Sequence, residues 1–304
     1  MRESLLRPPT LGPGARVALI APAGPLTKGD LPRAQENARS LGWEPVVGDH
    51  VLERDGYFAG EDEARLEDLN EAVQDDSIDA LWFLRGGYGA MRLLDEFDFD
   101  ALRRRPRALI GYSDITALHA AVGRHVGLVT YHAPTARSKL PTMSRTSLER
   151  ALVRGEDPLG RAERARVLRP GRARGRLAGG NLTLLASLVG TPYMPDLSGA
   201  LLVMEDVNEA VYRIDRMLRQ LILAGALAGV RGIAAGYFTN SDEEEPGGGR
   251  RKLDEVLTET ADMLGVPCIA GIPMGHIDDQ WTFPLGAVAE MDADALELHV
   301  LDGA

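Results

Sequence analysis

The sequence predicts an α/β protein of two domains. Short apolar runs alternate with helix-patterned segments, an order typical of parallel strands covered by helices. The chain has 304 residues, and a prior of roughly 150 residues per domain gives about two domains. Strong strand patterns stop between about 138 and 176, where Pro, Gly and Arg recur. We therefore expect an N-terminal domain at 1–152, a linker at 153–174 and a C-terminal domain at 175–304.

The N-terminal half is expected to repeat strand and helix units. The run RVALIAP at 16–22 is typical of a buried strand, and Leu66, Leu69 and Val73 share one helical stripe. In order, we expect a strand at 16–22, a helix at 31–41, strands at 43–47 and 78–84 on either side of a helix at 61–74, a strand at 108–112 and a helix from 115. Two of these strands end in unusual turns, RGGYG at 85–89 and GYSD at 111–114.

The C-terminal half continues the alternation and then becomes rich in strands. In order, we expect a helix at 182–189 after Gly179-Gly180-Asn181, a strand at 200–204, an amphipathic helix at 211–223, a strand at 232–238, a helix at 253–264 and short strands at 266–272, 280–284, 287–291 and 295–300. The last strands predict a small, partly antiparallel sheet at the end of the second domain.

Composition and charge exclude several classes of function. The formal charge of −11 disfavours nucleic acid and anionic membranes as partners. The longest apolar stretch, at 221–230, is shorter than the roughly 20 residues of a membrane span. The N-terminus lacks the apolar core of a signal peptide, and the single cysteine, Cys268, cannot form an internal disulfide. We expect a cytoplasmic protein.

Motifs for metals and cofactors are missing from the sequence. There is no H-E-x-x-H, no C-x-x-C and no phosphate-binding G-x-x-x-x-G-K-S/T, so neither a metal nor a cofactor is expected. The arginine cluster at 161–176 has no interleaved aromatic residues for base stacking and is interpreted as a solvated linker. The segment 241–251 (SDEEEPGGGRR) is interpreted as a surface loop, either inert or a mobile lid.

Three polar residues follow apolar strands, and in open α/β sheets the active crevice lies at the carboxyl ends of strands. Ser113 stands where a strand turns into a helix, either as an exposed nucleophile or as a helix N-cap. Glu205 follows the run LLVM and either orients a histidine or is a solvated acid. His276 is a candidate general base, with His132 at another strand end as its competitor and a structural role open for both.

The turn RGGYG also has a candidate role. Its glycines Gly86, Gly87 and Gly89 let backbone N–H groups approach a substrate closely. The helix after Ser113 adds further oriented donors. Together these groups would form an oxyanion hole beside a nucleophilic serine.

Five motifs resemble one family in their order and spacing. They are RGGYG at 85–89, GYSDIT at 111–116, GGNL at 179–182, LVMEDVNEAVYRIDRML at 202–218 and MGHIDDQWTFPLG at 274–286. The chain resembles the LD-carboxypeptidases, serine peptidases of the group that also includes the microcin C immunity proteins. The resemblance covers nearly the whole chain.

The resemblance implies a catalytic triad and an oxyanion hole. Ser113 would be the nucleophile, His276 the general acid and base, and Glu205 the residue that orients the imidazole. Backbone N–H groups of Gly87 and Asp114 would form the oxyanion hole. The implied fold joins an N-terminal domain similar to class I glutamine amidotransferases, which is flavodoxin-like, to a smaller C-terminal α/β domain ending in β-strands, in a homodimer.

The substrate implied by the family is a murein tetrapeptide. Cleavage between the L-centre of meso-diaminopimelate and the terminal D-alanine would serve cytoplasmic cell-wall recycling, without a cofactor. The free carboxylate of D-alanine predicts a cationic or N–H-rich pocket, whose residues the sequence does not identify.

The sequence leaves three alternative functions open. A microcin C immunity-type peptidase would cleave a peptide–nucleotide conjugate with the same triad and carry a loop tryptophan for base stacking, whereas Trp43, Trp82 and Trp281 fall in predicted strands. A silent module would only hold a small ligand. A glutamine amidotransferase would need a cysteine at the strand-to-helix turn, and Cys268 lies in a predicted strand instead.

Overall fold

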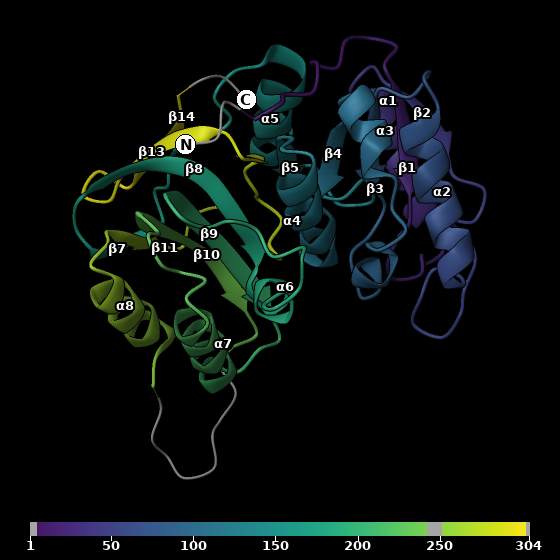
Figure 1. Ribbon diagram of the computed structural model, residues 1–304. Coiled ribbons are helices and arrows are strands. Elements are labelled where there is room, and N and C mark those ends of the chain that lie inside the picture. The colour runs from purple at the N-terminus through teal and green to yellow at the C-terminus, as the bar shows by residue number, and fades with distance from the viewer. Residues whose placement is uncertain (1–4, 242–250, 302–304) are drawn as a thin grey trace.

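Two mixed sheets and their helices make up the fold in the computed structural model, which describes residues 5–241 and 251–301 (Figure 1). The first sheet has the strand order β12-β5-β4-β3-β1-β2, and the second has the order β6-β14-β13-β8-β9-β10-β11-β7. The prediction of a two-domain α/β protein is confirmed.

The first sheet is parallel except for its last strand. Its members are β1 (Arg16–Ile20), β2 (Glu44–Val47), β3 (Ala80–Phe83), β4 (Ala108–Gly111), β5 (Thr130–His132) and the antiparallel β12 (Phe283–Leu285). Every residue of β3 and β4 is buried. Helices cover both faces of such a sheet, so side chains on both sides of each strand are buried. The strands are therefore continuous apolar runs in the sequence.

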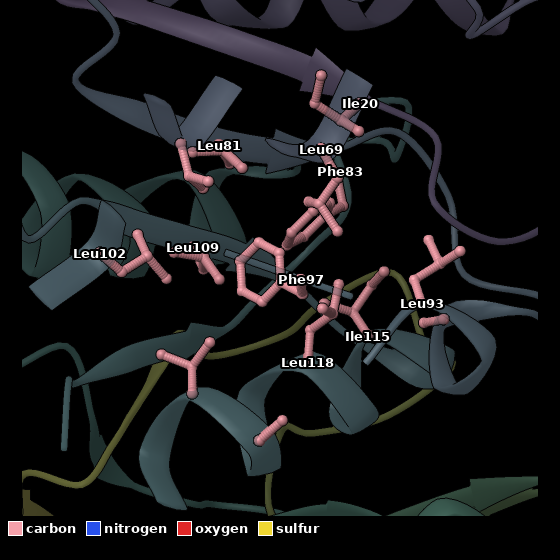
Figure 2. Close-up of a cluster of buried hydrophobic side chains, with 14 of the residues drawn as sticks. Ile20, Leu69, Leu81, Phe83, Leu93, Phe97, Leu102, Leu109, Ile115 and Leu118 are labelled. Atoms are coloured by element: carbon pink, nitrogen blue, oxygen red, sulfur yellow. The ribbon is translucent and has the colours of Figure 1, made fainter. Parts of the chain in front are cut away.

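Alternating side chains of the first sheet form two cores. Its helices are α1 (Asp30–Ser40), α2 (Asp62–Gln74), α3 (Phe99–Arg104), α4 (Thr116–His125) and α5 (Thr142–Glu149), with the shorter η1 (Ala90–Leu93), η2 (Ser113–Ile115) and η3 (Arg150–Arg154). On one face α2, α3 and α4 pack on the strands, and Figure 2 shows Phe83 and Phe97 between the strands and the helix that carries Leu118. On the other face Leu19 and Trp82 pack with residues of α1 and α5.

The second sheet has a parallel centre and antiparallel edges. Its strands are β6 (Gly160–Arg161), β7 (Arg166–Arg169), β8 (Arg172–Asn181), β9 (Ala200–Val207), β10 (Gly232–Thr239), β11 (Cys268–Ala270), β13 (Val288–Asp292) and β14 (Glu297–Val300). Strands β8 to β11 are parallel. Helices α7 (Val211–Leu223) and α8 (Leu253–Leu264) cover one face, and the short α6 (Leu182–Ser187) packs against α4 of the first unit (Figure 1).

The stretch at 153–174, which the sequence indicates as a solvated linker, carries strands of the second sheet. This stretch contains β6, β7 and the first residues of β8. Most of its arginines belong to strands, and the two on the edge strand β7 pair with acids of α8: Arg166 with Asp254 at 2.7 Å and Arg169 with Asp262 at 3.2 Å. Charged side chains are usual on edge strands, where they discourage pairing with another chain, and they hide the apolar alternation that identifies a strand.

The end of the chain also departs from the prediction. Strands β13 and β14 extend an eight-stranded sheet rather than forming a small one, and β12 joins the first sheet, where Phe283 lies opposite His132. Trp281 and Trp43 precede β12 and β2 rather than lying within them, although all three tryptophans are buried. The C-terminal segment therefore fastens the two sheets together, a long-range pairing that local sequence patterns do not reveal.

Two further expectations concern mobile or membrane segments. The candidate lid at 241–251 lies, apart from its two end residues, outside the described residues. Among the residues that the structure describes, no helix combines the length and apolar character needed to cross a bilayer.

Candidate active site

Ser113 lies at a strained turn directly after β4. Its φ angle is +66°, in the left-handed region that residues other than glycine rarely adopt. No side chain caps η2 or α4, which begin at this turn, so the N-cap interpretation of Ser113 is wrong. Strain of this kind persists where the surrounding structure enforces it, commonly at functional sites. The turn presents the Ser113 hydroxyl to His276, with Oγ 3.1 Å from Nε2.

The glycine turn of 85–89 packs directly against this serine. A Cβ atom on Gly86 would lie 2.8 Å from Ser113 Cβ and 3.2 Å from the backbone nitrogen of Asp114. Gly87 has a φ of +117°, and a Cβ there would lie 3.0 Å from Gly24 Cα. Only glycine fits both positions, because the two backbones approach too closely for a side chain. Backbone of the glycine turn and of the serine turn thus meet at one place.

The Asp114 side chain joins these two turns. Its Oδ2 accepts a hydrogen bond from the backbone N–H of Ala90 at 2.8 Å. The carboxyl is buried, and burial raises its pKa to about 6, while the hydrogen bond to Ala90 and the charge of Arg65 act in the opposite direction. Asp114 therefore fixes the geometry of the glycine turn through its side chain. The sequence analysis predicts a role only for its backbone N–H group.

Glu205 is a buried strand residue, not a solvated loop acid. Strand β9 continues to Val207, so the carboxylate points into the protein with no exposed surface. Its Oε2 lies 2.8 Å from His276 Nδ1, and its Oε1 accepts a hydrogen bond from Asn181 Nδ2 at 3.3 Å. Burial raises the pKa of Glu205, whereas the hydrogen bond from His276 lowers it.

His276 stands between the serine and the glutamate on the loop that joins β11 to β12. Its neighbour Gly275 has a φ of +118°, and a Cβ there would lie 2.8 Å from Tyr237 O and 3.1 Å from Glu205 Oε2. The loop can therefore reach β9 only with glycine at this position. The imidazole also faces the ring of Tyr112, with centroids 4.9 Å apart.

His132, the competing candidate base, has a different environment. Its side chain is fully buried between the rings of Tyr112 and Phe283. Neither ring nitrogen has a hydrogen-bond partner among the described residues. Burial lowers the pKa of His132 well below its usual value. The structure thus brings His276, and not His132, to the Ser113 hydroxyl.

Asn181 is a site residue that sequence reasoning missed. Besides Glu205, its Nδ2 donates to Asp206 Oδ1 at 3.0 Å, and its backbone N–H donates to Thr116 Oγ1 at 2.9 Å. A Cβ on Gly180 would lie 2.6 Å from that same Thr116 oxygen. The two glycines before Asn181 were the available signal, since they allow β8 to approach the start of α4 closely.

This geometry has a known chemical meaning. A hydroxyl, an imidazole and a buried carboxylate in hydrogen-bonded series can generate an alkoxide nucleophile. Serine hydrolases have the same series of hydrogen-bonded groups. An α/β fold with this site therefore belongs to the class of serine hydrolases.

Comparison with known proteins gives the family. Residues 17–133 match the model of the LD-carboxypeptidase N-terminal domain, and residues 174–291 match that of the C-terminal domain. The chain belongs to the LD-carboxypeptidase family. It is a serine-type carboxypeptidase, as the carboxypeptidases among its relatives support.

Three individual proteins illustrate the similarity. A Streptomyces coelicolor protein named as a carboxypeptidase is 40% identical, over 97% of this chain and 95% of its own. The murein tetrapeptide carboxypeptidase of Pseudomonas aeruginosa is 34% identical, over 92% and 94%. The crystal structure of an MccF-like protein from Bacillus anthracis is 24% identical with a TM-score of 0.88, covers 98% and 99%, and shows the same fold.

Proposed function

We propose that this protein releases the terminal D-alanine of murein tetrapeptides by cleaving the bond that follows the L-centre of meso-diaminopimelate. The observation that carries the proposal is the series Ser113, His276 and Glu205, with separations of 3.1 and 2.8 Å. The family and the name of the Pseudomonas relative support the choice of substrate.

The mechanism begins with proton transfer. His276 Nε2 accepts the proton of Ser113 Oγ as that oxygen attacks the peptide carbonyl, giving a tetrahedral anion. Backbone N–H groups of Gly87 and Asp114 stabilise the negative oxygen. The imidazolium then protonates the departing D-alanine amine. Water, deprotonated by the same imidazole, hydrolyses the ester and restores the Ser113 hydroxyl.

Glu205 supports both halves of this cycle. By accepting a hydrogen bond from the Nδ1–H group it holds Nε2 free to act as a base, and its negative charge stabilises the imidazolium that forms. Asn181 donates to the second carboxylate oxygen, which keeps the group fixed. Because Glu205 has no exposed surface, little water competes for these bonds.

The architecture belongs to the same proposal. The first sheet would be of the class I glutamine amidotransferase type, supported by its parallel order β2-β1-β3-β4-β5, which is the flavodoxin-like order. Ser113 would come from a domain ending at residue 152, and Glu205 and His276 from a domain at 175–304. The protein would act as a cytoplasmic homodimer in cell-wall recycling.

Mass spectrometry of products tests this function. Purified protein and its Ser113→Ala variant are incubated separately with L-Ala-γ-D-Glu-meso-diaminopimelate-D-Ala and with an aminoacyl–nucleotide conjugate. Release of D-alanine by the wild type alone is the expected result. Strong preference for the conjugate would assign an immunity-type activity instead, and no turnover of either substrate by folded protein would indicate a silent binding module.

A further inference from the structure

Two arginines follow strands of the sheet that carries Ser113. Arg85 is the first residue of the glycine turn after β3. Arg137 lies in the loop after β5, where the backbone N–H of Ala136 donates to Phe83 O at 2.9 Å. The side chain of Asn37 donates to the carbonyls on both sides of Arg137, at 2.8 and 2.9 Å. The backbone of both arginines is therefore fixed at the carboxyl edge of the first sheet.

Arg85 is close to the proposed oxyanion hole. A Cβ on Gly24 would lie 3.4 Å from Gly87 Cα and 3.5 Å from Arg85 Nε. The Arg85 guanidinium and Gly87 are therefore both neighbours of Gly24. Arg85 Nη1 donates to the carbonyl of Pro25 at 2.5 Å, which holds the side chain against this backbone. The guanidinium thus lies beside Gly87.

Arg137 lies near the same strand end, because its neighbour Ala136 donates to Phe83 O, two residues before Arg85. Its charge acts on the hydroxyl of Tyr112, whose ring packs 4.9 Å from that of His276. The charges of Arg85 and Arg137 also act on each other, and repulsion by Arg137 contributes to a lowered pKa of Arg85, after the larger effect of burial. Arg85 and Arg137 therefore lie near each other at the end of β3, where the glycine turn packs against Ser113.

Among Arg85, Arg137 and Asp30, positive charge is in excess. Asp30 is the carboxylate that faces both arginines, with Oδ1 3.4 Å from Arg137 Nη1. Its Oδ2 already accepts hydrogen bonds from the backbone N–H and the hydroxyl of Thr27, both at 2.7 Å. Arg137 Nε is buried and has no partner among the described residues. Two guanidinium groups and one shared carboxylate leave a net positive charge and a buried donor, which is the chemistry that binds a small oxyanion.

We propose that Arg85 and Arg137 bind the terminal α-carboxylate of the peptide substrate. The inference rests on the proposed carboxypeptidase function. In such a reaction the carboxylate belongs to the residue that leaves, and one residue advances the chain by about 3.8 Å. An anion receptor must therefore lie about one residue away from the oxyanion hole, and Arg85 is the cation that lies beside Gly87. The pair would restrict cleavage to the last bond of a peptide, since an internal bond has no carboxylate there.

The test compares two substrates that differ only in this group, the tetrapeptide ending in D-alanine and the same peptide ending in D-alaninamide. Arg137→Gln should reduce kcat/KM on the acid by about 10- to 100-fold, the loss expected for a charge-assisted hydrogen bond, and should change kcat/KM on the amide little. Arg137→Lys should recover part of the preference for the acid. Lys139→Gln is the matched control, because Lys139 carries the same charge two residues away, is exposed and pairs with Asp278.

Each outcome assigns the result to one of the two proposals. Wild-type release of D-alanine together with an unchanged acid-to-amide ratio in Arg137→Gln would overturn the arginine assignment and leave the proposed function standing. No release by the wild type would overturn the function and, with it, this inference. A phosphate presents similar oxyanion chemistry, so an aminoacyl–nucleotide conjugate is a third substrate. If Arg137→Gln weakens turnover of the conjugate alone, the pair binds phosphate and the carboxylate assignment is wrong.

Discussion

Glu205 Oε2 lies 2.8 Å from His276 Nδ1, although the two residues are 71 positions apart and come from a central strand and a loop. Glycine at 275 makes this approach possible, and Asn181 occupies the second oxygen of the carboxylate. A fully buried carboxylate is costly unless its hydrogen-bond partners are present. The site therefore depends on contacts among three segments that are distant in sequence.

Replacing Glu205 with glutamine tests its orienting role. We expect Glu205→Gln to fold and to lower kcat by about 10⁴-fold, the effect of the equivalent change in a Ser-His-Asp triad. The amide keeps the size of the side chain but removes the charge that stabilises the imidazolium, and its NH₂ group favours the wrong imidazole tautomer. Steady-state kinetics on the tetrapeptide, with circular dichroism as the folding control, measure this. A near-normal kcat would make Glu205 a structural acid.

Ser113 offers a stability measurement that is independent of substrate. Its φ of +66° is unfavourable for a side chain but not for glycine. Both Ser113→Ala and Ser113→Gly should abolish turnover. The free energy of unfolding should be about 1 kcal/mol higher for the glycine variant than for the alanine variant. Urea unfolding of the two variants gives the difference. Equal stability would show that the turn relaxes and stores no strain.

The pH dependence of stability reports on Asp114. Burial raises its folded-state pKa from 3.8 to about 6, so between these pH values the folded state holds more protons than the unfolded state. The contribution of this group to the free energy of unfolding is therefore greatest below pH 4 and is lost as pH rises through 6. We expect Asp114→Asn to remove this fall, on the order of 3 kcal/mol. Urea unfolding at a series of pH values measures it, and parallel curves for both proteins would contradict the prediction.

Sequence patterns located much of this site because each pattern was local. The runs ALIG and LLVM form buried strand segments, and each leads directly to a residue of the proposed triad, Ser113 after Tyr112 and Glu205 within β9. Local patterns also predicted α7 and α8 with the bounds that the structure has.

Other features could not be predicted because they depend on tertiary contacts. The role of Asn181 requires β8 to meet the start of α4, and β12 pairs with β5 across about 150 residues of chain. The strands within the predicted linker were hidden by arginines that pair with α8. Arg137 and Arg85 are far apart in sequence and become neighbours only where the strand ends of one sheet converge.

A substitution at Gly275 separates backbone strain from the loss of site geometry. Gly275→Ala places a methyl group 3.1 Å from Glu205 Oε2 and 2.8 Å from Tyr237 O, at a φ of +118°. Gly190 is the matched control, since its φ is also positive, at +85°, and a Cβ there would meet nothing within 4 Å.

Both variants should lose stability through backbone strain, by about 1–2 kcal/mol, but only Gly275→Ala should also lose activity, because the loop must shift and carry His276 away from Glu205. A displacement near 1 Å in a catalytic group lowers the rate by about 10²-fold. Thermal unfolding and kcat measured on both variants give the comparison. An equal loss of kcat in the two would mean that strain alone, and not the position of His276, limits the reaction.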